Sequence, residues 1–454
     1  MPSARSRHAF SLVLLFPDCP AVKSWVNNSF TVANSKFVTQ PVIRLVSLLL
    51  AIGLSGWVIS STARIGLSRL FVKYSLLTGN AAVADQAVQM SPKDAETHRA
   101  RSAVLNLSQP EASVSEMEHA VALRPHDYAL WVDLGLIRDQ AGDAAGALAA
   151  FDEAVKRAPF YALPRWQRGN LLLRVGKYDA AFDDLNRAAQ SNPDLVPNFI
   201  DLAWNLAQGD PKVVEQIVRV DSKVAHTTMA KYFASHGKPQ EAIDQFQAAG
   251  TTDEDTTYDV VSRLIGKGSF AEAYQVWSAA HGVTRSGQSG PIIFDGGFES
   301  SLSFDEGGFS WQIPRHLQAA TVSLDSSQPH SGAKNLRIEF SGDSNPGTDL
   351  VSQLVLVEPG RRYKINFAAR SQEIVSGGLP LIIVKDAGPD HKPLGQSQSW
   401  PKGSSSWNVI SFEFSTQSNT HAVVISIQRE GCSAPPCPIF GVISLDSVSI
   451  EQLQ

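Results

Sequence analysis

Cysteine, surplus positive charge and the common catalytic motifs are all scarce in this sequence. Three cysteines occur among 454 residues, and the formal net charge is −5. Nucleic-acid-binding proteins need an excess of Lys and Arg to neutralise phosphates, so we predict no nucleic-acid partner. The signatures GxSxG, HExxH and GxxxxGK[ST] are missing, and no His pair has zinc-ligand spacing. These absences predict a protein that is not an enzyme.

One long hydrophobic run is present near the N-terminus. Residues 45–63, LVSLLLAIGLSGWVISSTA, carry no charge over 19 positions, about the length that crosses a hydrocarbon core as a helix. Before it stand five cations and one acid: Arg5, Arg7, Lys23, Lys36, Arg44 and Asp18. We predict a disordered cytoplasmic segment over 1–41 and a transmembrane signal anchor over 42–63, with the body outside the cytoplasm. A cleaved signal peptide remains open, because Ser61-Thr62-Ala63 offers small residues for a peptidase.

The second and third cysteines support an exported body. Cys432 and Cys437 bracket the short Pro-rich loop CSAPPC, whereas Cys19 precedes the hydrophobic run. Two thiols this close in sequence and outside the cytoplasm predict a disulfide. A zinc pair is the alternative, and it lacks a second pair of ligands.

A step of 34 residues organises the middle of the chain. Shifting the stretch 128–159 by this step superimposes glycines, alanines and a proline on residues of the same type: Gly135 on Gly169, Gly142 on Gly176, Ala147 on Ala181, Ala154 on Ala188 and Pro159 on Pro193. A self-match at this period indicates a two-helix solenoid repeat. Weaker copies extend it over 64–283. Phe151, Leu185, Phe246 and Trp277 recur at one repeat position, and we predict that they fill the core between successive helix pairs.

The repeat resembles the tetratricopeptide repeat through Trp131, Leu134-Gly135, Ala147, Phe151, Ala154 and Pro159. The resemblance implies a concave groove, lined by the first helix of each pair, that takes an extended peptide or a partner helix. In these copies the groove positions are Asp139, Gln140, Trp166, Asn170 and Arg174. The alternative is that these side chains are merely solvated or pack on a neighbouring helix.

Helical periodicity ends at a Gly/Ser-rich stretch, 284–290, which we interpret as a flexible linker. Short β-rich runs separated by turn signals then fill 291–454, which predicts an antiparallel sandwich or jelly roll. This region resembles carbohydrate-binding modules of the group that includes families four, nine and twenty-two. The motifs that carry the resemblance are FDGGFES, HSGAKNLRI, VEPGRRYKINFAARS, WNVISFEF and LDSVSIE.

The resemblance implies a structural Ca²⁺ held by Glu299 and Asp446 together with backbone carbonyls. The alternative is that both carboxylates pair with a cation or cap a turn. Sugars stack on exposed aromatic rings, so Trp400, in a polar segment, and Trp311 are the predicted carbohydrate contacts; for Trp311, a core position is the alternative. Trp407 is assigned to the core of the fold.

The fold class predicted is multidomain α + β: one transmembrane helix, an all-α solenoid and an all-β jelly roll. We predict a non-enzymatic scaffold anchored in a bacterial inner membrane, with its body in the periplasm. Its solenoid would bind a partner protein and its sandwich a glycan or a second protein, by analogy with envelope or exopolysaccharide assembly. The alternative is a secreted glycan-binding protein whose solenoid is a spacer. Accessory action beside a glycosyl hydrolase ranks below both.

Overall fold

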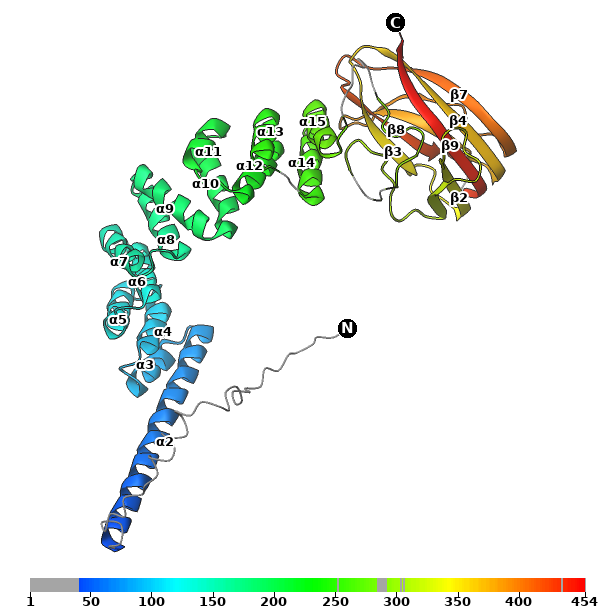
Figure 1. Cartoon of the computed structure of the whole chain (residues 1–454). Helices are drawn as coiled ribbons and strands as arrows, with labels where there is room; N and C mark the ends of the chain where they lie inside the picture. The colour runs from blue at the N-terminus through cyan, green and yellow to red at the C-terminus, as the bar shows by residue number, and fades with distance from the viewer. Residues whose placement is uncertain are drawn as a thin grey trace, which may run out of the picture. The chain divides into compact units, whose positions relative to one another are not determined.

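The computed structural model describes residues 41–250, 253–283, 292–302, 304, 307–433 and 436–453. The predicted cytoplasmic segment, apart from Pro41, and the predicted linker 284–290 lie outside these residues. The chain forms two compact units, unit 1 over Met1–Arg157 and unit 2 over Ala158–Gln454. The helices precede the strands along the chain, as the fold class requires (Figure 1).

Unit 1 begins with helix α2, which runs from Pro41 to Thr78 without a break. Its residues Leu45–Thr78 are long and apolar enough to cross a membrane by length and composition. The helix extends beyond the predicted end at residue 63, because its last turns become part of the solenoid. Val72 is buried there in a cluster with Ala87 and Ala100 of the next two helices.

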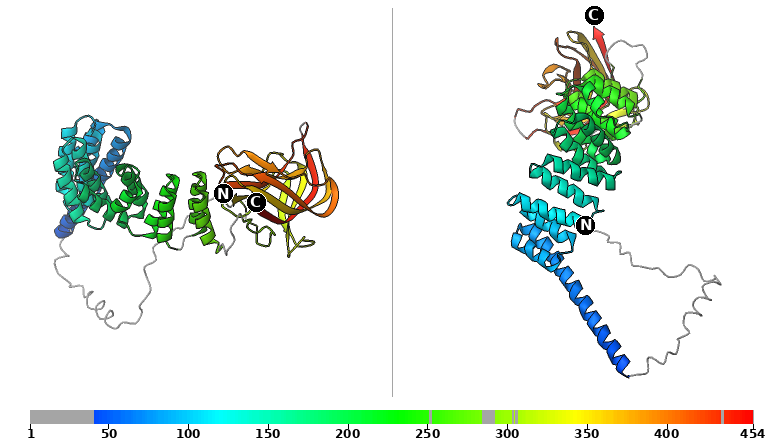
Figure 2. Two further views of the ribbon diagram at one scale, coloured as in Figure 1. Left: turned by 90° about the horizontal axis from the view of Figure 1, so that it is seen from above. Right: turned by 90° about the vertical axis from the view of Figure 1, so that its left-hand side faces the viewer.

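Three successive helix pairs make up the described part of unit 1 (Figures 1 and 2). They are α2 with α3 (Ala81–Met90), α4 (Ala95–Leu105) with α5 (Pro110–Leu123), and α6 (Tyr128–Gln140) with α7 (Ala144–Arg157). Side chains of Asn80, Asp94 and Asp127 accept N–H groups at the first turns of α3, α4 and α6. Such caps satisfy donors that the helix itself leaves unpaired. The caps of α4 and α6 fix the starts of two successive first helices, at Ala95 and Tyr128.

A glycine in α6 and another in α8 let the two helices of each of these pairs touch. A Cβ at Gly135 would lie 2.4 Å from Cε1 of Phe151, and a Cβ at Gly169 would lie 2.9 Å from Cγ of Leu185. Phe151 is 1% exposed and Leu185 is fully buried. Both residues are therefore core, as predicted, but these contacts lie within one helix pair rather than between successive pairs. Of the other two residues at this repeat position, Trp277 is 2% exposed and Phe246 is partly buried.

Unit 2 continues the helix pairs and then changes to strands. Its helices are α8 (Ala162–Arg174), α9 (Tyr178–Ser191), α10 (Val196–Leu206), α11 (Pro211–Ile217), α12 (Lys223–Ser235), α13 (Pro239–Ala248), α14 (Glu254–Gly266) and α15 (Phe270–Ala280), with a 3-10 turn at Pro193–Leu195. The weakest copy is α10 with the short α11. Gly209 has a φ of 80° between them, and Asp210 caps α11 through the N–H of Lys212.

Two antiparallel sheets form the sandwich. The five-stranded sheet has the order β1-β2-β9-β4-β7 and the four-stranded sheet the order β3-β8-β5-β6 (Figure 1). The strands are β1 (Ala320–Asp325), β2 (Asn335–Asp343), β3 (Val351–Leu356), β4 (Arg362–Ser376), β5 (Pro380–Asp386), β6 (Pro393–Gln396), β7 (Gly403–Ser415), β8 (Ala422–Arg429) and β9 (Pro438–Leu453). Inward-facing residues alternate along them; in β8, Val423, Ile425 and Ile427 enter the core.

The sandwich also packs against the last helix of the solenoid, within unit 2. The ring of Trp277 on α15 lies 5.1 Å from that of Phe294 and 5.7 Å from that of Phe309. Leu354 of β3 and Ala422 of β8 join the same buried cluster as the solenoid helices. The hydrophobic core therefore continues from the solenoid into one face of the sandwich.

Candidate protein-binding groove

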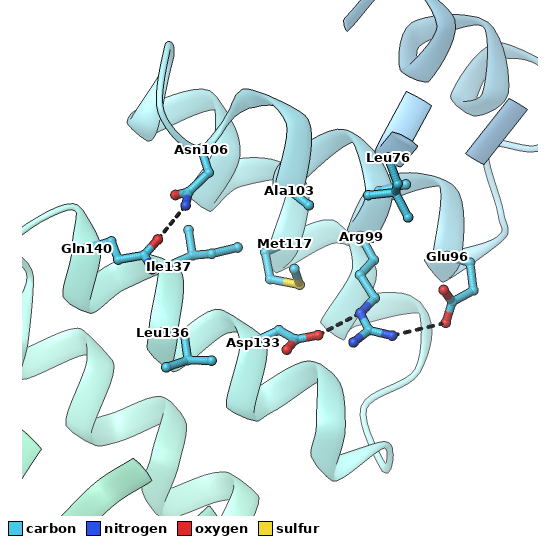
Figure 3. Close-up of a pocket in the computed structure, with 11 residues that line it drawn as sticks. Leu76, Glu96, Arg99, Ala103, Asn106, Met117, Asp133, Leu136, Ile137 and Gln140 are labelled. Atoms are coloured by element: carbon cyan, nitrogen blue, oxygen red, sulfur yellow. Dashed lines mark hydrogen bonds and ion pairs between the residues drawn. The ribbon is translucent and has the colours of Figure 1, made fainter. Parts of the chain in front are cut away.

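A pocket of about 440 Å³ opens on unit 1 (Figure 3). Its walls come from the first helices of the repeats, α4 and α6, with single residues from α2 and α5. The lining residues are Leu76, Glu96, Arg99, Ala100, Ala103, Asn106, Met117, Asp133, Leu136, Ile137 and Gln140. Pockets of this size hold one or two large side chains of a ligand.

Two polar contacts join α4 to α6 at the ends of this pocket, and we call them the staples. Arg99 Nε donates to Asp133 Oδ2 at 2.6 Å, and Asn106 Nδ2 donates to Gln140 Oε1. Both pairs are separated by 34 residues, so each staple joins equivalent positions of successive repeats. Glu96 adds a longer ion pair, 3.8 Å, to Arg99 (Figure 3).

Seven residues separate the two staples on each helix (106 − 99 and 140 − 133). Seven residues are two helical turns, or about 10 Å of helix axis. The side chains between the staples are apolar: Ala103 is exposed, and Met117 and Ile137 are almost completely buried beneath the opening. The result is an apolar slot with polar groups at both ends, which suits an apolar side chain flanked by the polar backbone of its own chain.

The acid at one end of the slot is partly desolvated. Burial raises the pKa of the Asp133 carboxyl, and the opposite effect of the Arg99 guanidinium does not cancel the increase. Both side chains retain some exposure, 24% for Asp133 and 42% for Arg99. A partly desolvated carboxylate is stabilised by any further hydrogen bond that an N–H group of a ligand donates to it.

Only one of the five predicted groove residues lines this pocket. Gln140 contributes to a staple, and Asp139 stands beside it on α6 without lining the pocket. Trp166, Asn170 and Arg174 lie on α8 of unit 2. There Trp166 packs against the solenoid core, Arg174 is exposed, and Asn170 Nδ2 donates to the carbonyl of Trp166 at 2.9 Å. The amide of Asn170 thus bonds its own helix.

The sequence reasoning missed Glu96, Arg99, Asn106 and Asp133. Most of these residues belong to the copy over 94–127, whose match to the repeat pattern is weak. A signal was nevertheless present, because Arg99 and Asp133 have opposite charges at the 34-residue step. A search for complementary side chains at the repeat period would have found both staples.

The two tryptophans predicted to contact carbohydrate lie inside the sandwich. The predicted exposure of Trp400 is wrong, and for Trp311 the alternative of a core position is the correct one. Trp400 is fully buried, with its ring 5.2 Å from that of Phe367. Trp311 is 5% exposed, stacks 5.0 Å from Phe298, and donates through Nε1 to the carbonyl of Asp295. Their polar sequence neighbours stay at the surface while the indoles fill the core. Neither ring has a face free for a sugar.

Trp407 was assigned to the core, and this assignment is also wrong. It is half-buried and belongs to neither large hydrophobic cluster. The Arg370 guanidinium lies 5.1 Å from its ring centroid, and its Nε1 donates to the carbonyl of Gln328 at 3.0 Å. The pairing register between β4 and β7 shifts beside Ala369. The part of β7 that contains Trp407 is therefore oriented differently from the part that contains Phe412 and Phe414.

Glu299 and Asp446 bind the same turn. Asp446 Oδ2 accepts the N–H groups of His330 and Ser331, and Glu299 Oε1 accepts that of Ala333 at 2.8 Å. These bonds satisfy the carboxylates as caps of the turn, which was the alternative to calcium. Within the described ranges no group of three or more His, Cys, Asp or Glu side chains gathers as a metal site. A Ca²⁺ here would depend on backbone carbonyls for most of its ligands.

Cys432 and Cys437 form a disulfide, with their Cα atoms 5.6 Å apart. Cys437 is 6% exposed and Cys432 is half-buried. The bond closes the loop between β8 and β9.

Comparisons with known proteins identify the repeat. Residues 102–162 match the tetratricopeptide repeat family. This part of the solenoid is similar to tetratricopeptide repeats. Protein FlbA of Caulobacter vibrioides is 29% identical over 89 residues, which are 20% of this chain and 15% of FlbA. The chain thus spans about 15% of the length of this curated relative.

Two solved structures are partly similar to the chain. The crystal structure of MamA is 15% identical, covers 37% of this chain and 84% of its own, and has a TM-score of 0.25. The CBM22-1 xylan-binding domain from Paenibacillus barcinonensis Xyn10C is 12% identical, covers 37% of this chain and 99% of its own, and has a TM-score of 0.26.

Proposed function

We propose that this chain is a membrane-tethered, non-enzymatic scaffold that binds a partner protein in the slot between the staples. The observation that carries the proposal is the slot itself: about 440 Å³ with an apolar floor between two polar ends. The tetratricopeptide match over 102–162 covers α5 and α6, which contribute to it. A partner would insert an apolar side chain, while its backbone bonds the groups of the staples.

Site-specific photocrosslinking tests the slot. Ala103 and Ala149 are exposed helical alanines of unit 1, and only Ala103 lines the pocket. Placing p-benzoylphenylalanine at residue 103 should give a discrete adduct in cells, and the same probe at residue 149 should give none. Ala103→Trp, which fills the slot, should then abolish an adduct formed from a probe at Leu136, whereas Ala149→Trp should not. Equal adducts from residues 103 and 149 would contradict the proposal.

The tether rests on α2. The apolar side chains of its N-terminal part are exposed, such as Leu50 at 65% and Trp57 at 69%, and a hydrocarbon environment would cover them. We propose a single crossing of a bacterial inner membrane with the body in the periplasm. The process served would be envelope or exopolysaccharide assembly. Membrane fractionation tests the tether: full-length protein should sediment with membranes, and a soluble form beginning near Arg64 would rule it out.

Glycan binding by the sandwich is a second candidate function, favoured by one observation. Trp407 presents a half-buried indole outside the sandwich core, next to His330 at 5.7 Å between ring centroids. Sugar rings stack on such surfaces. A glycan array should show binding that Trp407→Ala abolishes and that Phe412→Leu, a change on the core side of β7, leaves intact. No binding to any glycan would leave protein docking as the role of the sandwich.

A structural Ca²⁺ at Glu299 and Asp446 stays a proposal. Calcium titration calorimetry on the chelator-treated protein checks it directly. A heat of binding that disappears in Asp446→Asn supports the site. A melting temperature that neither Ca²⁺ nor chelator changes would leave both residues as caps of the 330–334 turn.

A further inference from the structure

Arg429, at the end of β8, carries a buried positive charge that reaches mainly neutral acceptors. The residue is 3% exposed. Its Nε donates to the carbonyl of Gly378 at 3.3 Å, Nη1 to the carbonyl of Ser344, and Nη2 to Ser376 Oγ at 3.0 Å. Nη2 also donates to Cys437, to its carbonyl at 2.9 Å and its Sγ at 3.3 Å. A buried cation without a close counter-ion is unfavourable, so this site would be stabilised by a negative charge.

One acid faces the same region. Asp343 Oδ1 accepts the N–H of Cys437 at 3.1 Å. Burial lowers the pKa of Arg429, and the Asp343 charge acts in the opposite direction without cancelling it. The sulfur of Cys437 is in direct contact with Arg429 and is uncharged while the disulfide is intact.

The two cysteines of the disulfide differ in exposure. Cys437 is 6% exposed, whereas Cys432 is half-buried in the loop that follows β8. Cys432 Sγ lies over two glycines, at which a Cβ would come within 3.2 Å (Gly377) and 3.3 Å (Gly378) of the sulfur. We expect an external thiol to reach the more exposed Cys432, and attack there makes Cys437 the leaving group.

We propose that Cys432–Cys437 is an exchange site for an external dithiol, with Arg429 stabilising the leaving thiolate. The thiolate of the dithiol attacks Cys432 Sγ, a mixed disulfide forms, and the S–S electron pair leaves on Cys437 Sγ opposite the guanidinium. The second thiol of the reagent then attacks the mixed disulfide and becomes oxidised, and its proton passes to the released Cys432. Exchange is faster when the leaving thiol has a lower pKa, and a neighbouring cation lowers it.

The first experiment measures reduction of the folded, full-length protein in a Cys19→Ser background. Dithiothreitol is the probe, and peptide-resolved alkylation counts the free thiols. We expect reduction below the unfolding transition, slowed about tenfold in Arg429→Gln and restored by Arg429→Lys, which keeps the charge. Arg337→Gln on the same sandwich should behave as the unchanged protein. A disulfide that resists millimolar dithiothreitol until the sandwich unfolds, or equal rates with and without the Arg429 charge, overturns the proposal.

A second measurement covers the case in which Arg429→Gln fails to fold. In the same background, Cys437→Ser leaves the accessible thiol alone and Cys432→Ser leaves the buried one. At a pH at which both thiols are ionised, oxidised dithiothreitol or glutathione disulfide should form a mixed disulfide at Cys432 at least tenfold faster than at Cys437. Equal rates at the two sulfurs would show that attack has no preferred direction and would refute the proposal.

Discussion

Gly135→Ala is the sharpest test of how the repeats pack. The new methyl would lie 2.4 Å from Phe151 Cε1, and ordinary contacts begin at 3.4 Å, so the ring must move by about 1.0 Å (3.4 − 2.4). At Gly169 the same substitution needs about 0.5 Å (3.4 − 2.9) from Leu185. Overpacking of a tight core destabilises by about 1–3 kcal/mol, and the higher helix propensity of Ala returns about 1 kcal/mol. We expect net losses of about 1–2 kcal/mol at residue 135 and under about 1 kcal/mol at residue 169.

Hydrogen exchange followed by mass spectrometry measures this locally, which suits a chain that does not unfold in one step. Peptides from α6 and α7 should exchange about tenfold faster in Gly135→Ala, since about 1.4 kcal/mol corresponds to a factor of ten. Gly266→Ala in α14 is the control, because nothing lies within 4 Å of its Cβ position. If Gly135→Ala were as stable as Gly266→Ala, or if Gly169→Ala were the worse variant, the packing argument would be refuted.

Three further substitutions give distinct results. Hydrogen bonds from the Thr256 N–H and hydroxyl lower the pKa of Asp253, which caps α14. The stability that this carboxylate contributes is fully present above its unfolded-state pKa, about 3.9, and is lost as the pH falls through its lower folded-state pKa. Asp253→Asn should cap without titrating, which exchange of α14 peptides checks at acid pH after correction for intrinsic rates. Trp400→Ala should lower the free energy of unfolding of the sandwich by about 3–5 kcal/mol, measured by thermal unfolding, and Trp407→Ala by much less. The reverse order would support the prediction from sequence that Trp400 is exposed and Trp407 is core. Trp277→Ala should raise exchange in α15 and also in residues 307–313, whereas a change confined to α15 would contradict their shared core.

The solenoid could be predicted because its packing repeats at a fixed step. Gly135 and Gly169 recur 34 residues apart, and the large side chains that fill the space beside them, Phe151 and Leu185, recur at the same step. Each of these contacts lies within one helix pair, so a pattern found in one pair predicts the packing of the next pair that carries it. Helix α2 and the Cys432–Cys437 disulfide are also local features. The first could be predicted from a run of apolar residues and the second from the close spacing of two cysteines.

The sandwich aromatics could not be assigned in this way. Trp400 and Trp407 both stand in polar, Ser-rich sequence, seven positions apart, yet one is fully buried and the other half-exposed. The difference depends on partners far away in the chain: Ser444 supplies the carbonyl facing Trp400 Nε1, and Gln328 supplies the one that Trp407 binds. Composition around a residue reports the polarity of its segment, whereas burial depends on which strand faces it across the sheet.

The junction between the solenoid and the sandwich explains the burial of Trp277, which the repeat pattern alone predicts as a core residue. A solenoid ends with an apolar face that lacks a following repeat, and a polar cap normally covers it. Trp277 occupies this face at the last repeat and is 2% exposed, because Phe294, Phe309 and Leu354 cover it. Gly308, where a Cβ would lie 2.7 Å from Trp277 Cδ1, lets the covering segment approach the indole. The sandwich therefore provides the cap of the solenoid, and a spacer role in which the two parts move freely would leave this tryptophan in water.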